Sequence, residues 1–301
     1  MSPDVKSLVK SISRRMLGVD DPRLFVRRLR RQAQRRIWPT YTTAELMATL
    51  AKVGLRNGRT VFVHSSWDEM FNYTGTPVEL LDALSAAVGE GGTLAFPAFP
   101  TKQDPAVVFD VRRTPSGAGL ITELFRRRPG VLRSIHMNHS VCARGPNAKY
   151  LTEAHHRSVT SWDRSSPYWR LREVDALIIG LGLGRTLEAC TALHCADSIL
   201  RDELPFFHNV LADRVEYRYR DEQGRPGEHS YYRMRGRLRE RRIARYLDRR
   251  YFRQATLSNL RIYAVEAQHL IDRTIDLGRR GITMYVDPAP RPELFRPFGS
   301  R

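Results

Sequence analysis

Residues 191–198, Thr-Ala-Leu-His-Cys-Ala-Asp-Ser, hold the side chains of this sequence that are best suited to acid–base chemistry. If the segment is helical, His194 and Asp197 stand three residues apart on one face of the helix. The carboxylate can then accept the N–H of one imidazole nitrogen and leave the other nitrogen free to act as a base. An ordinary structural pair of helix residues has the same spacing and stays open as an alternative.

Cys195 follows His194 directly, and a thiol beside an imidazole suggests a nucleophile. Neighbouring helical residues diverge by about 100° around the axis, so these two side chains do not pair with each other. The other cysteines, Cys142 and Cys190, complete no Cys-X-X-Cys motif, and three cysteines are too few for a disulfide framework. This cysteine usage favours a reducing cytoplasm.

Small polar residues and glycines follow predicted strands or precede a predicted helix, which is where open α/β sheets collect ligands. Hydroxyls and free backbone N–H groups near an arginine form an anion site. Three short motifs have this composition: His64-Ser65-Ser66, then Thr114 with Ser116 and Gly117, then Arg133 with Ser134 and His136. Each motif taken singly is weak, because Ser-Gly turns occur in most proteins.

Two other kinds of site are disfavoured by spacing. The glycines of Gly180-Leu181-Gly182-Leu183-Gly184 fall at every second position and miss the Gly-X-Gly-X-X-Gly pattern of a dinucleotide site. The histidines and cysteines are scattered, and the adjacent His155 and His156 point apart on a helix, so no metal site is expected.

Apolar periodicity predicts alternating strands and helices after Pro39. Strands are expected at 59–63, 93–96 and 175–180, and helices after a capping box at 42–45 and over 77–88. Residues 211–235 are predicted to form a β-hairpin, and residues 235–253 an arginine-rich helix. We therefore predict one large α/β domain over 41–301, with a central mixed β-sheet flanked by helices, after a basic helical arm over 1–40.

The positive charge is concentrated in two segments. The 301 residues hold 50 Lys/Arg and 32 Asp/Glu, a formal charge of +18. Residues 1–40 hold 11 Lys/Arg and three Asp, and residues 231–253 hold ten Arg and two acidic residues, so each segment carries +8 and the rest only +2. No apolar run approaches the roughly 18 to 20 residues of a membrane span, and the start lacks the apolar core of a secretory signal.

Read in order from about Val61 to Leu200, the short motifs resemble the aminoglycoside 3-N-acetyltransferase family, also called antibiotic N-acetyltransferases. The resemblance rests on many ordered pieces: Val63-His64-Ser65-Ser66, Val88-Gly89-Glu90-Gly91-Gly92-Thr93-Leu94, Thr114-Pro115-Ser116-Gly117, Arg133-Ser134-Ile135-His136, Ser166-Pro167 and Thr191-Ala192-Leu193-His194. Each piece is short, and their common order and workable spacing make the combined signal strong.

The resemblance implies transfer of an acetyl group from acetyl-CoA to an amine of an amino sugar, directly and without a covalent enzyme intermediate. It maps the coenzyme site to His64, Ser65, Ser66, Thr114, Ser116 and Gly117, with Arg133, Ser134 and His136 close by. It maps the general base to His194, and it places Asp197 where the family usually has Glu. A second departure is Met137, which stands where the family has proline.

The acceptor is less defined by these motifs. Asp68, Glu69 and Asp163 are expected to contact a cationic amino sugar, whereas the two +8 segments repel a polycationic drug and attract anions. This balance favours a biosynthetic intermediate of a polysaccharide or secondary metabolite, with aminoglycoside resistance as the alternative. Nucleic-acid binding is the alternative of another class and is disfavoured. Residues 1–40 are expected either to contact the inner face of the membrane or to dock on their own domain. A homo-oligomer is a further alternative.

Overall fold

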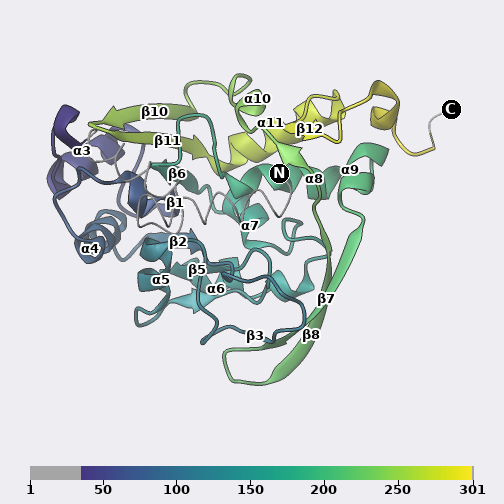
Figure 1. Ribbon diagram of the computed structural model, residues 1–301, viewed down its shortest axis with the longest axis horizontal. Coiled ribbons are helices and arrows are strands. Elements are labelled where there is room, and N and C mark those ends of the chain that lie inside the picture. The colour runs from purple at the N-terminus through teal and green to yellow at the C-terminus, as the bar shows by residue number, and fades with distance from the viewer. Residues whose placement is uncertain (1–34, 300–301) are drawn as a thin grey trace, which may run out of the picture.

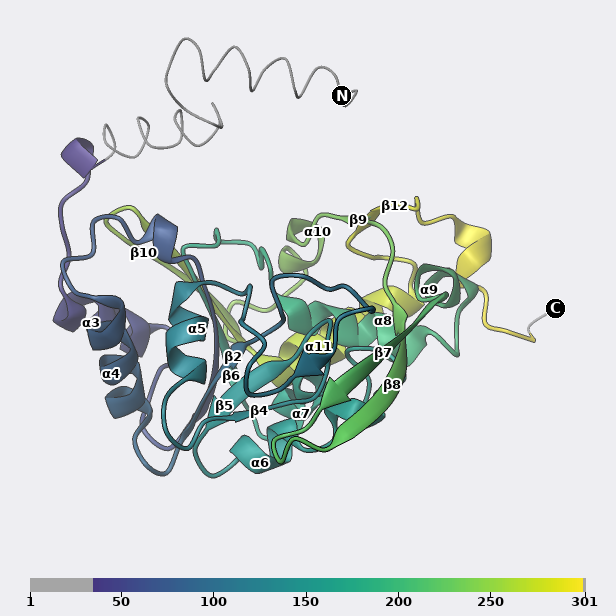
Figure 2. The same ribbon diagram turned by 60° about the horizontal axis from the view of Figure 1, so that its bottom comes forward.

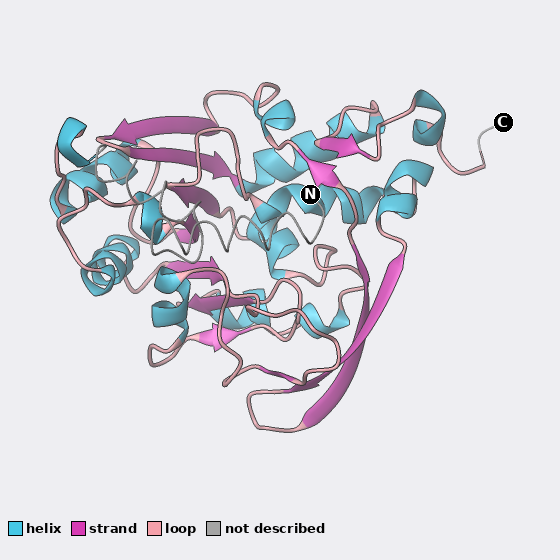
Figure 3. Ribbon diagram, viewed as in Figure 1, coloured by secondary structure: helices cyan, strands magenta, loops and turns pink. Residues whose placement is uncertain are grey.

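A seven-stranded mixed sheet runs through the centre of the molecule in the order β10-β11-β6-β1-β2-β5-β4. The computed structural model describes residues 35–299. In the sheet, β1 pairs in parallel with β2 and β6, and the remaining neighbours are antiparallel (Figures 1 and 3). The strands are β1 (Thr60–Ser65), β2 (Thr93–Pro97), β4 (Leu132–Arg133), β5 (Val141–Arg144), β6 (Leu177–Leu181), β10 (Phe252–Leu257) and β11 (Leu260–Glu266).

Helices cover both faces of this sheet (Figure 2). One face packs against α3 (Thr43–Lys52), α4 (Pro77–Val88) and α5 (Leu120–Arg126). The other packs against α6 (Ala148–Thr152), α7 (Pro167–Glu173), α8 (Cys195–Leu200), α9 (Pro205–Val210), α10 (Arg241–Ala244) and α11 (Ala267–Arg279). Side chains alternate between the faces with the period of a strand: Val61 and Val63 point to the first face and Phe62 to the second.

The described part of the chain also forms two smaller sheets. β7 (Asp213–Arg220) and β8 (Pro226–Arg233) form a long hairpin along the edge of the molecule, and β3 (Phe109–Asp110) pairs in parallel with β7. β9 (Arg237–Leu238) pairs with β12 (Tyr285–Asp287). Within residues 35–299, four short 3-10 helices occur in loops: η1 (Trp67–Glu69), η2 (His155–Arg157), η3 (Thr191–His194) and η4 (Pro292–Phe295).

The α/β prediction is confirmed, because its signals are local in the sequence. Helix α4 spans the predicted residues, and the capping box of α3 forms with Thr42 and Glu45 bonded in both directions. The three predicted strands correspond to β1, β2 and β6, and the predicted hairpin corresponds to β7 and β8. The mixed sheet with helices on both faces also agrees with the expectation.

The predicted arginine-rich helix over 235–253 is wrong. Only Arg241–Ala244 is helical, between β9 and the start of β10. Gly236 has a φ of +136°, which an α-helix does not accommodate, and Leu238 pairs with Tyr285, 47 residues further along the chain. The periodicity of residues within this segment gives no information about a strand partner so far along the chain.

The basic arm predicted over 1–40 lies mostly outside the described residues, and so do the expectations attached to it. Among residues 35–299, no helix has both the length and the apolar composition that a bilayer crossing requires. Cys142, Cys190 and Cys195 are free thiols buried in the core.

Candidate active site

His194 and Asp197 form a hydrogen-bonded pair at the junction of η3 and α8. The distance between His194 Nδ1 and Asp197 Oδ2 is 2.8 Å. The predicted helical segment 191–198 is a 3-10 turn that runs into an α-helix, and this geometry brings both side chains to one side. The His194 side chain is 12% exposed and that of Asp197 only 3%. Because a carboxylate oxygen accepts, Nδ1 carries the proton of this hydrogen bond, and Nε2 of the neutral tautomer is the nitrogen with a free lone pair.

Asp197 receives a second donor from a distant part of the chain. The Tyr285 hydroxyl donates to the same oxygen, Oδ2, at 2.8 Å. Tyr285 is fully buried on β12. The carboxylate is therefore held by two hydrogen bonds on one atom in a site that excludes bulk water.

Aromatic rings form the wall beside the pair. The Trp162 indole stacks on the His194 imidazole with centroids 4.5 Å apart, and it also contacts His139, with centroids 4.8 Å apart. Burial lowers the pKa of His139 to about 3, with smaller contributions from the neighbouring His194 and His64. Burial likewise lowers the pKa of His64, at the end of β1, to about 3. Both side chains are neutral near pH 7, and the interactions show that His64, His139 and His194 share one neighbourhood.

The serines of the first predicted motif lie at the carboxyl end of β1. Ser65 and Ser66 are partly exposed there, and the Ser65 carbonyl oxygen lies 3.8 Å from where a Cβ on Gly119 would stand. The segment 117–119 therefore runs beside the end of β1. His64 Nε2 is buried without a hydrogen-bond partner at the same place.

The second motif forms the tight turn before α5. Thr114 Oγ1 accepts from the N–H of Asp110, and Ser116 Oγ accepts from the N–H of Ala118. Gly117 donates its N–H to the Phe99 carbonyl, and a Cβ there would lie 2.7 Å from the Thr101 Cα, so only glycine fits. The first two predicted coenzyme motifs therefore lie side by side.

The structure corrects the third motif. Arg133 is 8% exposed, and its guanidinium donates to the backbone carbonyls of Ala98, Val111 and Thr114. Burial lowers its pKa to about 10. Because its donors are already used inside the protein, Arg133 holds the 110–117 loop rather than presenting a charge to the coenzyme.

Ser134 and His136 are likewise internal. Ser134 is fully buried and bonds His155 Nδ1 at 2.9 Å. His136 is also fully buried, and its Nδ1 accepts from the N–H groups of Asn138 and His139. Ser134 and His136 therefore support the surrounding loops from within the core, and neither side chain is accessible to a ligand.

The three predicted acceptor-binding acids lie in different settings. Asp163 accepts from the N–H groups of Val159, Thr160 and Ser165, so its carboxylate shapes the loop that carries Trp162. Asp68 and Glu69 lie in η1, directly after β1, where Asp68 is exposed and Glu69 is partly buried. The structure thus places Asp68 and Glu69 near the strand end and gives Asp163 an internal role.

Three side chains of this site were missed by sequence reasoning: Trp162, His139 and Tyr285. Trp162 and Tyr285 lie 32 and 88 residues from the members of the pair that they contact. His139 was given no role from the sequence. No local spacing signals contacts of this range.

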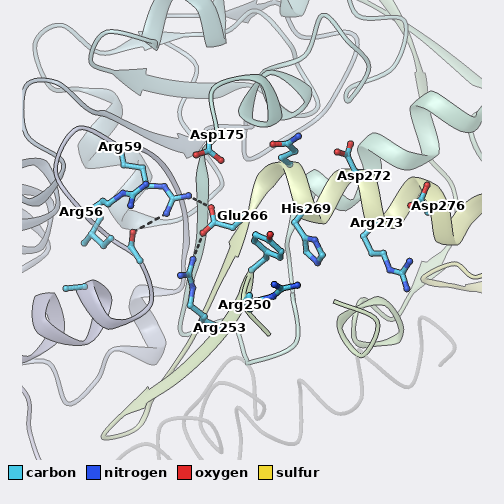
Figure 4. Close-up of a pocket in the computed structure, with 15 residues that line it drawn as sticks. Arg56, Arg59, Asp175, Arg250, Arg253, Glu266, His269, Asp272, Arg273 and Asp276 are labelled. Carbon is cyan, nitrogen blue, oxygen red and sulfur yellow. Dashed lines mark hydrogen bonds and ion pairs between the residues drawn. The ribbon is translucent and has the colours of Figure 1, made fainter. Parts of the chain in front are cut away.

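A cleft of about 820 Å³ lies at the opposite end of β1 (Figure 4). Five arginines and four acidic side chains line it, so its charges nearly balance. Glu266 accepts from both Arg59 and Arg253 in its interior. This cleft is stabilised by internal ion pairs and is separate from the His194 site.

Comparison with known proteins agrees with the geometry. The family model described as aminoglycoside 3-N-acetyltransferase matches residues 62–277, which include the strand-end motifs, His194 and Asp197. The chain belongs to the aminoglycoside 3-N-acetyltransferase family. It is accordingly an N-acetyltransferase, an acyltransferase that uses acetyl-CoA as co-substrate.

Individual members of the family show the extent of the likeness. Aminoglycoside N(3)-acetyltransferase IV from Salmonella sp is 31% identical over 182 residues, 58% of this chain and 67% of the relative. Aminoglycoside N(3)-acetyltransferase VII from Streptomyces paromomycinus is 30% identical over 219 residues, 63% of this chain and 74% of the relative.

Solved structures of aminoglycoside acetyltransferases share the fold. AAC-VIa bound to sisomicin is 26% identical, with a TM-score of 0.65 over 79% of this chain and 97% of that one. AAC-IIIb in a binary complex with CoASH is 22% identical, with a TM-score of 0.67 over 84% of this chain and 100% of that one. The latter likeness concerns the fold alone.

Proposed function

We propose that this acetyltransferase acetylates an amine of an aminoglycoside, the 3-amino group first, with His194 as general base. The single observation that carries the proposal is the His194–Asp197 hydrogen bond, which leaves Nε2 available at a site of this family. The names of the relatives from Salmonella and Streptomyces, and the sisomicin complex of AAC-VIa, support an aminoglycoside acceptor.

The biosynthetic acceptor expected from the sequence rests on the charge of two segments, and the structure weakens that reasoning. Several arginines of 231–253 are engaged within the protein: Arg235 pairs with Asp213, Arg250 with Asp248, and Arg242 donates to the Tyr285 carbonyl. Their charge is partly used in holding the C-terminal part of the fold. The aminoglycoside alternative is therefore the better supported of the two.

The residues at the end of β1 fit a coenzyme. His64 Nε2 is a buried polar atom without a partner, and the partly exposed Ser65 and Ser66 lie beside the 114–117 turn. We infer that these serines, together with Thr114, Ser116 and Gly117, hold acetyl-CoA. Acetyl-CoA supplies an acetyl group activated as a thioester.

The protein residues then manage one proton. Asp197 accepts the Nδ1–H of His194 and orients Nε2. Nε2 removes a proton from the acceptor amine while the amine nitrogen forms its bond to the acetyl carbonyl carbon. The resulting imidazolium returns this proton to the departing thiolate, so the products are an N-acetylated sugar and CoA with a free thiol. The charge that develops on His194 is stabilised by the buried Asp197 carboxylate.

An acceptor panel tests the proposal. Purified protein is mixed with acetyl-CoA and either gentamicin, sisomicin, apramycin or a nucleotide-linked amino sugar, and CoA release and product mass are measured. We expect acetylated aminoglycosides, and a kcat for His194→Ala about 10² to 10⁴-fold below wild type. His208→Ala, at an exposed position on α9, is the matched control.

Two results would contradict the proposal. Acetylation of the nucleotide-linked sugar alone would restore the biosynthetic acceptor. An unchanged rate in His194→Ala would remove His194 from the chemistry.

A further inference from the structure

Tyr285 joins His194 and Asp197 in one hydrogen-bonded group, although it lies beyond the residues 62–277 that the family model matches. Its hydroxyl and the His194 Nδ1–H both donate to Asp197 Oδ2, each at 2.8 Å. Tyr285 is 0% exposed and Asp197 2% exposed, so bulk water does not replace either donor. The carboxylate rotamer thus depends on both partners.

Contacts with the arginine-rich segment, residues 231–253, hold Tyr285 in this position. β12 pairs with β9, where Tyr285 stands opposite Leu238. The Arg239 N–H donates to the Met284 carbonyl at 2.8 Å, and the Arg242 guanidinium donates to the Tyr285 carbonyl. Figure 2 shows β12 beside β9, and the Tyr285 hydroxyl of β12 reaches Asp197 on α8. Residues 231–253 were expected to attract an anion because of their charge. Part of this segment instead holds β12 next to the catalytic region.

We propose that Tyr285 is a positioning residue for acetyl transfer, which acts through Asp197 to hold His194 in the orientation for proton removal. This inference rests on the proposed role of His194 as general base. A hydroxyl on Oδ2 fixes the carboxylate and offsets part of its negative charge. Without it, the His194 N–H alone holds Oδ2 of Asp197, and the less compensated charge of the carboxylate favours the imidazolium form of His194 more strongly.

Two further observations agree with a permanent donor role. Burial, followed by the charge and hydrogen bond of Asp197, raises the pKa of Tyr285 well above its ordinary value, so the hydroxyl keeps its proton. The Phe206 ring packs edge-on against Tyr285 with centroids 5.4 Å apart, which restricts the phenol ring. The side chain is a fixed neutral donor.

The test compares Tyr285→Phe with Tyr263→Phe. Tyr263 is also fully buried, and its hydroxyl bonds the Glu188 carbonyl at 3.1 Å and the Cys190 side chain but not Asp197, so it is a control for the loss of a buried hydroxyl. We expect Tyr285→Phe to lower kcat about tenfold with an unchanged KM for acetyl-CoA. The acid limb of its kcat/KM profile should move to higher pH by about half a unit to one unit. Tyr263→Phe should move neither quantity.

A double-mutant cycle identifies the route of the effect. If Tyr285 acts through Asp197, adding Tyr285→Phe to Asp197→Asn should lower kcat less than about twofold further. Arg242→Met, which removes a β12 anchor without touching Asp197, should show the same pH shift at smaller size and serves if Tyr285→Phe does not fold. The inference would be overturned if Tyr285→Phe lowered kcat equally in the wild type and in Asp197→Asn. It would also be overturned if the pH profile of kcat/KM were unchanged in both Tyr285→Phe and Arg242→Met.

A failure of the role of Tyr285 can be distinguished from a failure of the proposed function. If the wild-type protein acetylates none of the acceptors, or if His194→Ala retains full activity, the proposed function is wrong. If the wild type is active and depends on His194 while Tyr285→Phe behaves as Tyr263→Phe, only the role of Tyr285 is wrong.

Discussion

The imidazole of His194 lies against the indole of Trp162, with ring centroids 4.5 Å apart and planes inclined by 29°. Trp162 is 1% exposed, so its own position is fixed by the core. The stack sets the plane of the imidazole, and the hydrogen bond from Nδ1 to Asp197 sets its rotation within that plane. Two independent contacts thus fix the orientation of the imidazole that we propose as the general base.

Removing the Trp162 ring should lower kcat by more than the accompanying loss of folding stability explains. We expect Trp162→Ala to lower kcat by about 10 to 100-fold, because the ring of His194 loses its support. Trp162→Phe keeps an aromatic face and should lose less than about tenfold. Trp169→Ala, at a buried tryptophan of α7, is the control, since both alanine variants should cost about 3 to 5 kcal/mol in unfolding free energy. Equal kcat in the two folded alanine variants would contradict the role of the stack.

The length of the Asp197 side chain should also matter. Asp197→Asn replaces a carboxylate that accepts two donors on one oxygen, and we expect kcat to fall about 10²-fold or more. Asp197→Glu restores the residue usual in the family, but its extra methylene has no room at a 2% exposed position, so we expect about a tenfold loss. Steady-state kinetics with Asp202→Asn as an exposed control checks both. A Glu variant as active as wild type would show that reach is not limiting.

Arg133 should affect coenzyme binding through the loop that it holds. Arg133→Lys leaves some of the carbonyls of Ala98, Val111 and Thr114 without donors, which should lower the unfolding free energy by about 2 to 4 kcal/mol. The KM for acetyl-CoA should rise several-fold while kcat at saturation stays near wild type. Arg113→Lys, on the exposed side of the same loop, should change neither value. A larger effect from Arg113→Lys would mean that the exposed guanidinium of Arg113, and not the buried Arg133, serves the coenzyme.

Acid should destabilise the folded protein before its carboxylates are protonated. Burial lowers the pKa of His64 to about 3 from an ordinary 6.5, and lowers that of His136 and His155 well below 6.5. These imidazoles are neutral when folded, whereas the unfolded chain binds their protons below about pH 6.5. Stability is therefore full above pH 6.5 and falls as the pH drops toward 3, by about 2 kcal/mol per imidazole at pH 5.

Urea unfolding at several pH values measures this slope. His64→Asn removes one such imidazole and should make the slope shallower by about one proton. His208→Asn, on the surface, should leave the slope unchanged. A wild-type stability that is flat from pH 7 to 5 would contradict the prediction.

The cleft in Figure 4 should matter for stability and not for catalysis. Glu266→Gln leaves Arg59 and Arg253 sharing a neutral amide in place of a carboxylate, so we expect a loss of about 2 to 4 kcal/mol in unfolding free energy. Because the cleft lies at the other end of β1 from the His194 site, kcat and both KM values should stay near wild type. A changed KM for either substrate would show that this cleft communicates with the active site.

Features encoded by neighbouring residues were predictable from the sequence. The capping box of Thr42 and Glu45, the apolar alternation of β1 and the three-residue spacing of His194 and Asp197 depend on residues close in the chain. The ordered motifs between 61 and 200 also sufficed to indicate the family, which the match over 62–277 confirms.

Features that depend on distant contacts were not predictable. Arg133 was expected to lie at the coenzyme site, but its guanidinium is bonded to backbone carbonyls of two separate segments, Ala98 and the 110–117 loop. The arginine-rich segment was expected to be a helix, but β12 pairs with part of it. Both errors have one physical cause: a hydrogen-bonding group takes whichever partner the fold brings near, and sequence spacing does not state which.

The sequence by itself determined the α/β fold, the family and a histidine–aspartate pair capable of acid–base chemistry. Only the tertiary structure decided that Trp162 stacks on His194, that Tyr285 shares the Asp197 oxygen, and that Ser134 and His136 are buried supports. The reason is that periodicity and spacing record the energetics of one helix turn or one strand. The orientation of a catalytic side chain is set by packing among segments up to 88 residues apart.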